Sequence, residues 1–138
     1  MTAASVGRQR YQERYPATLE AATQARRDIA HVLETWGLPQ LIDVAEQVVT
    51  ELVANAVAHT NAPRVGASIT RTGQESARIV VTDTSRTRPA RGKPNPEDEH
   101  GRGLVLVDAL AHDWGSELVR GGKRVWAELR VPVADGAP

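Results

Sequence analysis

Apolar residues recur with a helical period in two segments of the first half of the chain. The period predicts a first helix from Leu19 to Trp36, which Gly37 ends. Pro39-Gln40 separates it from a second predicted helix, Leu41 to His59. In the first helix, the positions that keep the period are Leu19, Ala22, Arg26, Ile29, Ala30 and Leu33.

Shorter segments with alternating apolar residues predict β-strands. Gly73-Gln74 and Gly121-Gly122 are turn sequences that each separate two such segments, so we expect two hairpins. A further apolar segment after Gly101 predicts a third helix. Helices on one face of a mixed, mostly antiparallel sheet make a two-layer α/β sandwich, which is the predicted fold. The predicted strands are Tyr11 to Tyr15, Val65 to Thr72, Ala77 to Asp83, Trp114 to Val119 and Val125 to Val133.

A chain of 138 residues is long enough for one domain and too short for two. We expect the domain to span residues 11–133, after a loose leader of residues 1–10 and before a tail of residues 134–138. Residues 84–100 hold three prolines and no periodic pattern. Such a long segment inside a compact domain is often functional, so we interpret it as a lid over a ligand; a plain mobile loop is the alternative.

The second predicted helix carries two polar side chains four residues apart, Glu51 and Asn55. Residues at this spacing share a helix face, and both lie at the border of the apolar stripe, so we expect them to line a pocket. An amide oxygen is a suitable ligand for Mg²⁺, and a carboxylate one turn away can orient or deprotonate a nucleophile. This pair suits metal-assisted phosphoryl transfer. The alternative is that both residues mark only the edge of the buried face.

Two later segments favour the functional interpretation. The β-branched run that begins at Arg78 ends at Asp83, whose carboxylate can accept a hydrogen bond from an exocyclic amine such as that of adenine. A simple turn residue is the alternative there. Gly101 and Gly103 open the next apolar segment, and backbone amides at a helix start can cradle phosphates. An ordinary turn between loop and helix would have the same glycines.

In this order, the motifs resemble those of the GHKL, or Bergerat-fold, ATPases. The chain is most similar to the small bacterial anti-sigma-factor serine kinases and their actinobacterial relatives. The resemblance extends from about Tyr15 to Val133. It is carried by Glu51-x-x-x-Asn55, Asp83, Gly101-Arg102-Gly103-Leu104, Ala25-Arg26, Trp36-Gly37-Leu38, Asp113-Trp114-Gly115 and the segment Gly122 to Leu129.

The resemblance implies a role for each motif residue. Asn55 would coordinate Mg²⁺, and Glu51 would act as the general base or its orienting partner. Asp83 would accept a hydrogen bond from the adenine amine, and two glycines would bracket the phosphates of ATP. The segment that contacts the nucleotide would be Gly101, Arg102, Gly103 and Leu104.

One motif departs from the family pattern. Relatives with a complete nucleotide site have Asp-x-Gly-x-Gly after the strand, whereas Ser85 and Thr87 stand at the glycine positions here. Glycine lets the backbone pass close to the base and adopt positive φ, which a larger residue opposes. The departure is the basis of the second functional hypothesis below.

Composition reduces the number of protein classes and site types to which the chain can belong. The 17 basic and 17 acidic residues cancel, so charge gives no reason to expect nucleic acid or an anionic membrane as the main partner. The absence of cysteine excludes disulfides and cysteine-based zinc sites. The sequence shows neither an N-terminal signal pattern nor an apolar run of membrane-spanning length, so we expect a cytoplasmic protein.

The leading hypothesis is an ATP- and Mg²⁺-binding protein kinase of the anti-sigma type. By resemblance it would phosphorylate a serine or threonine on a small antagonist protein, sequester a sigma factor and form a homodimer. The second hypothesis comes from another class. It is a binding module that keeps the fold, has lost useful catalysis and acts by holding a partner protein.

Overall fold

The structure, a computed structural model, describes residues 9–84 and 99–132. The predicted leader, most of the predicted lid and the tail therefore lie almost entirely outside the described residues. The strands are β1 (Arg10–Pro16), β2 (Arg64–Gly73), β3 (Ser76–Asp83), β4 (Asp113–Val119) and β5 (Gly122–Arg130). The helices are α1 (Glu20–Thr35), the short 3-10 helix η2 (Pro39–Leu41), α2 (Ile42–His59) and α3 (Glu99–Leu110).

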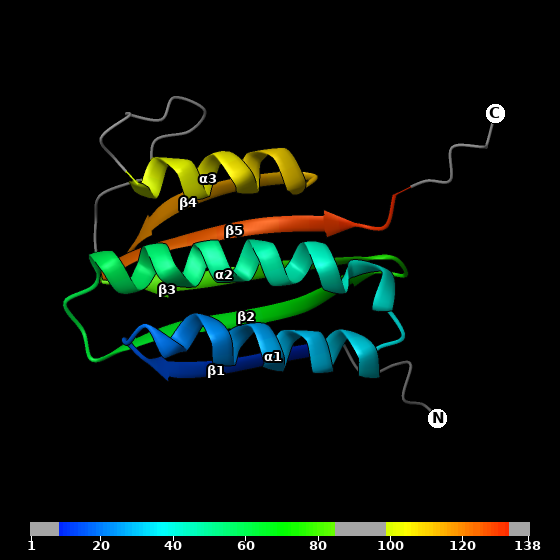
Figure 1. Ribbon diagram of the computed structural model, residues 1–138, viewed down its shortest axis with the longest axis horizontal. Coiled ribbons are helices and arrows are strands. Elements are labelled where there is room, and N and C mark those ends of the chain that lie inside the picture. Colours follow the sequence, from blue (N-terminus) through cyan, green and yellow to red (C-terminus); the bar gives the residue numbers. More distant parts are fainter. Residues whose placement is uncertain (1–8, 85–98, 133–138) are drawn as a thin grey trace.

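The strands form one sheet in the order β1-β2-β3-β5-β4, and α1, α2 and α3 lie on one of its faces (Figure 1). The predicted two-layer α/β sandwich is confirmed, and each pairing between these strands is antiparallel. β1 and β4 are the edge strands. The chain reaches β4 through α3, so β5 returns between β3 and β4 rather than at the outside of the sheet.

The central helix α2 packs against α1, α3 and three of the strands. Its predicted apolar stripe is confirmed, because its aliphatic residues on that side are at most 2% exposed. Valine and alanine dominate this face, so the helix can lie close to the sheet. The buried residues of α2 are Ala45, Val48, Val49, Leu52, Val53, Asn55 and Ala56.

The stripe predicted for the first helix is confirmed at Ile29 and Leu33 and wrong at Leu19 and Arg26. Leu19 precedes α1 and is 88% exposed, and Arg26 is also exposed. Small residues at the start of the helix allow it to approach α2 and the sheet, so they turn inward in place of the larger leucine. The residues of α1 that are at most 1% exposed are Ala21, Ala25, Ile29 and Leu33.

Polar contacts join the edge strands to the helices. The hydroxyl of Tyr15 donates a hydrogen bond to Asp28 Oδ2 at 2.6 Å, which ties β1 to α1, and burial raises the pKa of this phenol. At the other edge, the indole N–H of Trp114 donates to Asp108 Oδ1 at 2.7 Å and ties β4 to α3. Trp114 is 2% exposed and belongs to the hydrophobic core.

None of the helices within residues 9–84 and 99–132 combines the length and hydropathy that a membrane span requires.

The corrected stripe of α1 leads to a stability prediction. Leu33→Ala should lower the free energy of unfolding by about 2–5 kcal/mol, because it removes a buried side chain and leaves a cavity. Leu19→Ala, which removes the same atoms at an exposed position, should change it by less than about 0.5 kcal/mol. Urea unfolding followed by circular dichroism measures both, and similar losses in the two variants would contradict the observed orientation of the helix.

Candidate functional site

The helices and the strand that contain the predicted site residues meet at one end of the molecule. The C-terminal end of α2, the C-terminal end of β3 and the N-terminal end of α3 lie together there (Figure 1). Hydrogen bonds join the first two: the hydroxyls of Thr60 and Thr84 are 2.9 Å apart, and the Asn61 N–H donates to Thr84 Oγ1 at 3.0 Å. The fold thus brings Asn55 and Asp83 to the same end of the sheet as the glycines of α3.

Asn55 is buried in an unusual way for a polar residue. It is 5% exposed, and its Oδ1 atom has no hydrogen-bond partner within the described residues. Buried polar groups are nearly always hydrogen-bonded, and an unsatisfied one costs about 1–3 kcal/mol. Glu51, one turn earlier on α2, is half-buried. Within the described residues, the amide oxygen of Asn55 is therefore a buried acceptor that a ligand could use.

Asp83 ends β3 and is 8% exposed. In the register of the sheet it stands directly opposite Lys123 of β5, and the distance from Lys123 Nζ to Asp83 Oδ2 is 4.0 Å. Lys123 is completely buried, and this burial lowers the pKa of its ammonium group, while the charge of Asp83 acts to raise it. The site therefore contains a buried ion pair.

The sequence analysis included Lys123 in the segment that carries the resemblance but gave it no role, because the predicted strand begins only at Val125. The observed strand β5 begins at Gly122, so Lys123 belongs to the sheet. Extending the alternation of Val125, Ala127 and Leu129 backwards by one step would have placed Lys123 on the inward face.

A glycine allows β5 to pass close to Asp83. A Cβ atom at Gly122 would lie 1.9 Å from the Asp83 carbonyl oxygen, a separation that no side chain can occupy. The preceding residue, Gly121, has φ +83°, which favours glycine in the turn from β4. The two glycines predicted as a turn thus differ in role: one makes the turn, and the other brings the strand against the end of β3.

The third helix begins earlier than predicted. α3 starts at Glu99, so Gly101 and Gly103 lie inside its first turns rather than before them. Leu104 is 2% exposed and belongs to the hydrophobic core, so its side chain anchors this helix. The side chain of Arg102 lies outside what the structure describes.

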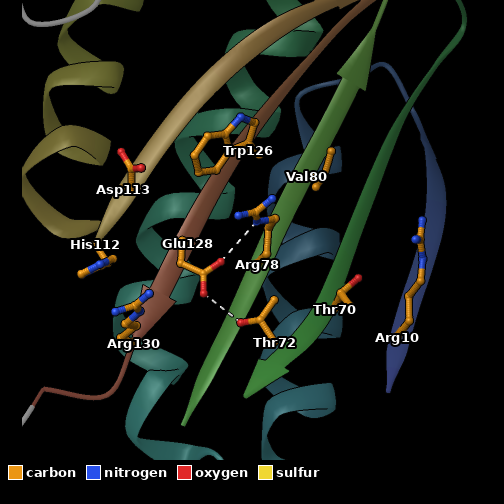
Figure 2. A pocket seen from close by; sticks show the side chains of 10 residues that line it. All are labelled: Arg10, Thr70, Thr72, Arg78, Val80, His112, Asp113, Trp126, Glu128 and Arg130. Atoms are coloured by element: carbon orange, nitrogen blue, oxygen red, sulfur yellow. Dashed lines mark hydrogen bonds and ion pairs between the residues drawn. The ribbon is translucent and has the colours of Figure 1, made fainter. Parts of the chain in front are cut away.

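A separate pocket lies on the sheet face opposite the helices (Figure 2). In it Glu128 is 7% exposed and accepts hydrogen bonds from the Thr72 hydroxyl at 2.8 Å and from Arg78 Nε at 3.2 Å. The Arg78 guanidinium also stacks over the Trp126 ring, 4.5 Å from its centroid. The sheet lies between this pocket and the helices. The pocket is therefore separate from the predicted nucleotide site.

Comparisons with known proteins agree with the observed fold. The sequence signature of the histidine kinase-like ATPase domain matches residues 15–129. Among solved structures, the RsbU and RsbW domains of Rv1364c from Mycobacterium tuberculosis superpose with a TM-score of 0.69 at 20% sequence identity. The alignment covers 91% of this chain and 33% of that chain, so this chain spans about a third of the length of the solved chain. No curated protein sequence matches the chain.

Proposed function

Because this chain belongs to the histidine kinase-like ATPase domain family, we propose that it binds ATP together with Mg²⁺ and acts as a serine/threonine protein kinase of the anti-sigma type. The observation that carries the proposal is the buried amide oxygen of Asn55, which has no hydrogen-bond partner within the described residues. A metal ion is one ligand that would satisfy this atom. Asn55 lies within residues 15–129, the part of the chain that matches the family signature.

The chemistry of Asn55 fits Mg²⁺. This ion prefers oxygen ligands, keeps several waters and is commonly held by one or two protein groups together with substrate phosphates. Asn55 would supply one such oxygen, and the bound metal would neutralise charge on the phosphates. A single protein ligand at the buried face of α2 is therefore sufficient for a metal that arrives with the nucleotide.

The other site residues have complementary roles in this proposal. Asp83, at the end of β3, would accept a hydrogen bond from the adenine amine. Gly101 lies in the first turn of α3, where backbone N–H groups have no intrahelical acceptor and can bind phosphate oxygens, and Gly103 follows it. Glu51 would orient or deprotonate the hydroxyl that attacks, because it lies one turn from Asn55 on the same face.

The proposed partners are a sigma factor, an antagonist protein with a phosphorylatable serine or threonine, or both. This part of the proposal is supported by the sequence resemblance to anti-sigma-factor kinases, as are a homodimer and a cytoplasmic location. The proposal includes no direct contact with nucleic acid or membrane.

A second candidate function is a partner-binding module without useful catalysis. The observation that favours it is the presence of Ser85 and Thr87 where relatives with a complete nucleotide site have glycine. Calorimetric titration with ATP, with and without Mg²⁺, separates the two functions. Binding that requires Mg²⁺ supports the kinase, and the absence of nucleotide binding supports the module.

Asn55→Ala tests the metal ligand. The variant should lose the Mg²⁺-dependent part of ATP affinity and keep its thermal unfolding midpoint, because the missing oxygen has no partner to lose within the described residues. Gln47→Ala removes an amide from an exposed position of the same helix and should bind Mg-ATP as the parent does. Unchanged Mg-ATP affinity in folded Asn55→Ala would exclude this role.

Glu51→Gln tests the chemical step. We expect Mg-ATP affinity near that of the parent and phosphate transfer slower by about 10²–10⁴-fold, the usual contribution of a general base. Glu46→Gln, a carboxylate change earlier on α2, is the matched control and should keep full turnover. The measurement is transfer of labelled phosphate to a purified antagonist, and equal rates in parent and Glu51→Gln would refute the assignment.

The partner proposal predicts a stable complex in the native cytoplasm. Affinity purification followed by mass spectrometry, with and without ATP, should recover a sigma factor or a small antagonist. A nucleotide that changes the protein surface must change partner affinity by the same factor that the partner changes nucleotide affinity. The Asn55→Ala variant should therefore lose the ATP-dependent part of the recovery. Recovery of neither partner under either condition would contradict the proposal.

A further inference from the structure

Lys123 is a charged residue with no solvent exposure at the start of β5. Lysine is almost never fully buried unless its charge is paired. Here the side chains of Lys123 and Asp83 are 0% and 1% exposed, and their charged atoms are 4.0 Å apart. The ammonium group is thus kept in an unfavourable environment. It lies next to the carboxylate of Asp83, which in the proposed function binds the adenine amine.

The ion pair has a chemical consequence for base recognition. A desolvated carboxylate without a nearby cation tends to take up a proton. A protonated carboxyl carries a donor, whereas the amine of adenine requires an acceptor. The separation of 4.0 Å is too long for a hydrogen bond, so Lys123 compensates the charge of Asp83 without using Oδ2 as its own acceptor.

We propose that Lys123 is a positioning residue of the nucleotide site, which holds Asp83 as a charged acceptor for the exocyclic amine of adenine. This inference rests on the proposed ATP binding and adds to it a residue from β5. Residues of both β3 and β5 then determine the preference for adenine, although only Asp83 needs to contact the adenine base. A purely structural ion pair would instead affect all nucleotides equally.

The neighbouring residue provides a matched control. Arg124 follows Lys123 on β5 and therefore faces the opposite side of the sheet. Its side chain is 47% exposed and forms an ion pair with Glu117 of β4, whose side chain is 51% exposed. Removing this charge changes the same strand without touching the helix-covered face.

The experiment compares Mg-ATP with Mg-ITP, which carries a carbonyl oxygen in place of the amine, by calorimetric titration. The parent should prefer ATP. Lys123→Met should weaken ATP binding about tenfold, the difference between a charged and a neutral acceptor, and leave ITP binding unchanged or tighter. Arg124→Met should keep the parent's ratio. Asp83→Asn should lose the preference as Lys123→Met does, and combining the two changes should add little.

Each outcome decides between the alternatives. An unchanged ATP-to-ITP ratio in folded Lys123→Met, or an equal loss of both nucleotides, overturns the positioning role. If thermal unfolding shows that Lys123→Met does not fold, Lys123→Gln replaces it, and an unchanged ratio in Asp83→Asn also overturns the inference. A parent protein that binds neither nucleotide refutes the proposed function itself, and the inference with it.

Discussion

The packing of α2 between the other two helices and the sheet is the contact on which the rest of the structure depends. Figure 1 shows this helix in the middle of its layer, between α1 and α3. Full burial of an aliphatic side chain contributes about 1.5–3 kcal/mol, and α2 buries such residues over most of its length. The helix is therefore held in one position, and so are the polar groups that it carries.

The polar and charged side chains of the candidate site are buried, which costs free energy. Asn55 lies on the packed face of α2, and Asp83 and Lys123 lie on the inward face of the sheet. Each loses hydration on folding, and Asn55 Oδ1 has no hydrogen-bond partner within the described residues. Natural proteins often accept such destabilisation at functional sites, where ligand binding returns it. The apolar packing around α2 supplies the stability that this arrangement requires.

Much of the fold follows from local sequence. The spacing of apolar residues in α2 and the glycine pairs between strands act over a few residues, so the helix and both hairpins could be predicted. In α1 the local pattern identified Ile29 and Leu33 as core residues. It could not show which residues at the start of the helix face the core, because Leu19 is more apolar than Ala21 and only the close approach of α2 decides between them.

The candidate site was only partly visible in the sequence. Asn55 and Asp83 stand at the ends of strong patterns, and their order along the chain is informative. Lys123 was hidden because its importance comes from pairing between β3 and β5, which are separated by a helix and a strand. Similarly, α3 extends to Glu99 although two glycines follow, because anchoring of Leu104 and Val107 in the core outweighs the weak helix propensity of glycine.

The edge strands also affect how the domain behaves in a crowded cell. An unprotected edge can add a strand from another molecule and start aggregation. β1 carries exposed charges at Arg10, Glu13 and Arg14 and ends at Pro16, while β4 carries exposed Asp113 and Glu117. Charges and proline are common means of blocking such additions. The sheet is therefore poorly suited to grow sideways, which allows a domain of this kind to accumulate, or to sit beside other domains, without polymerising through its edges.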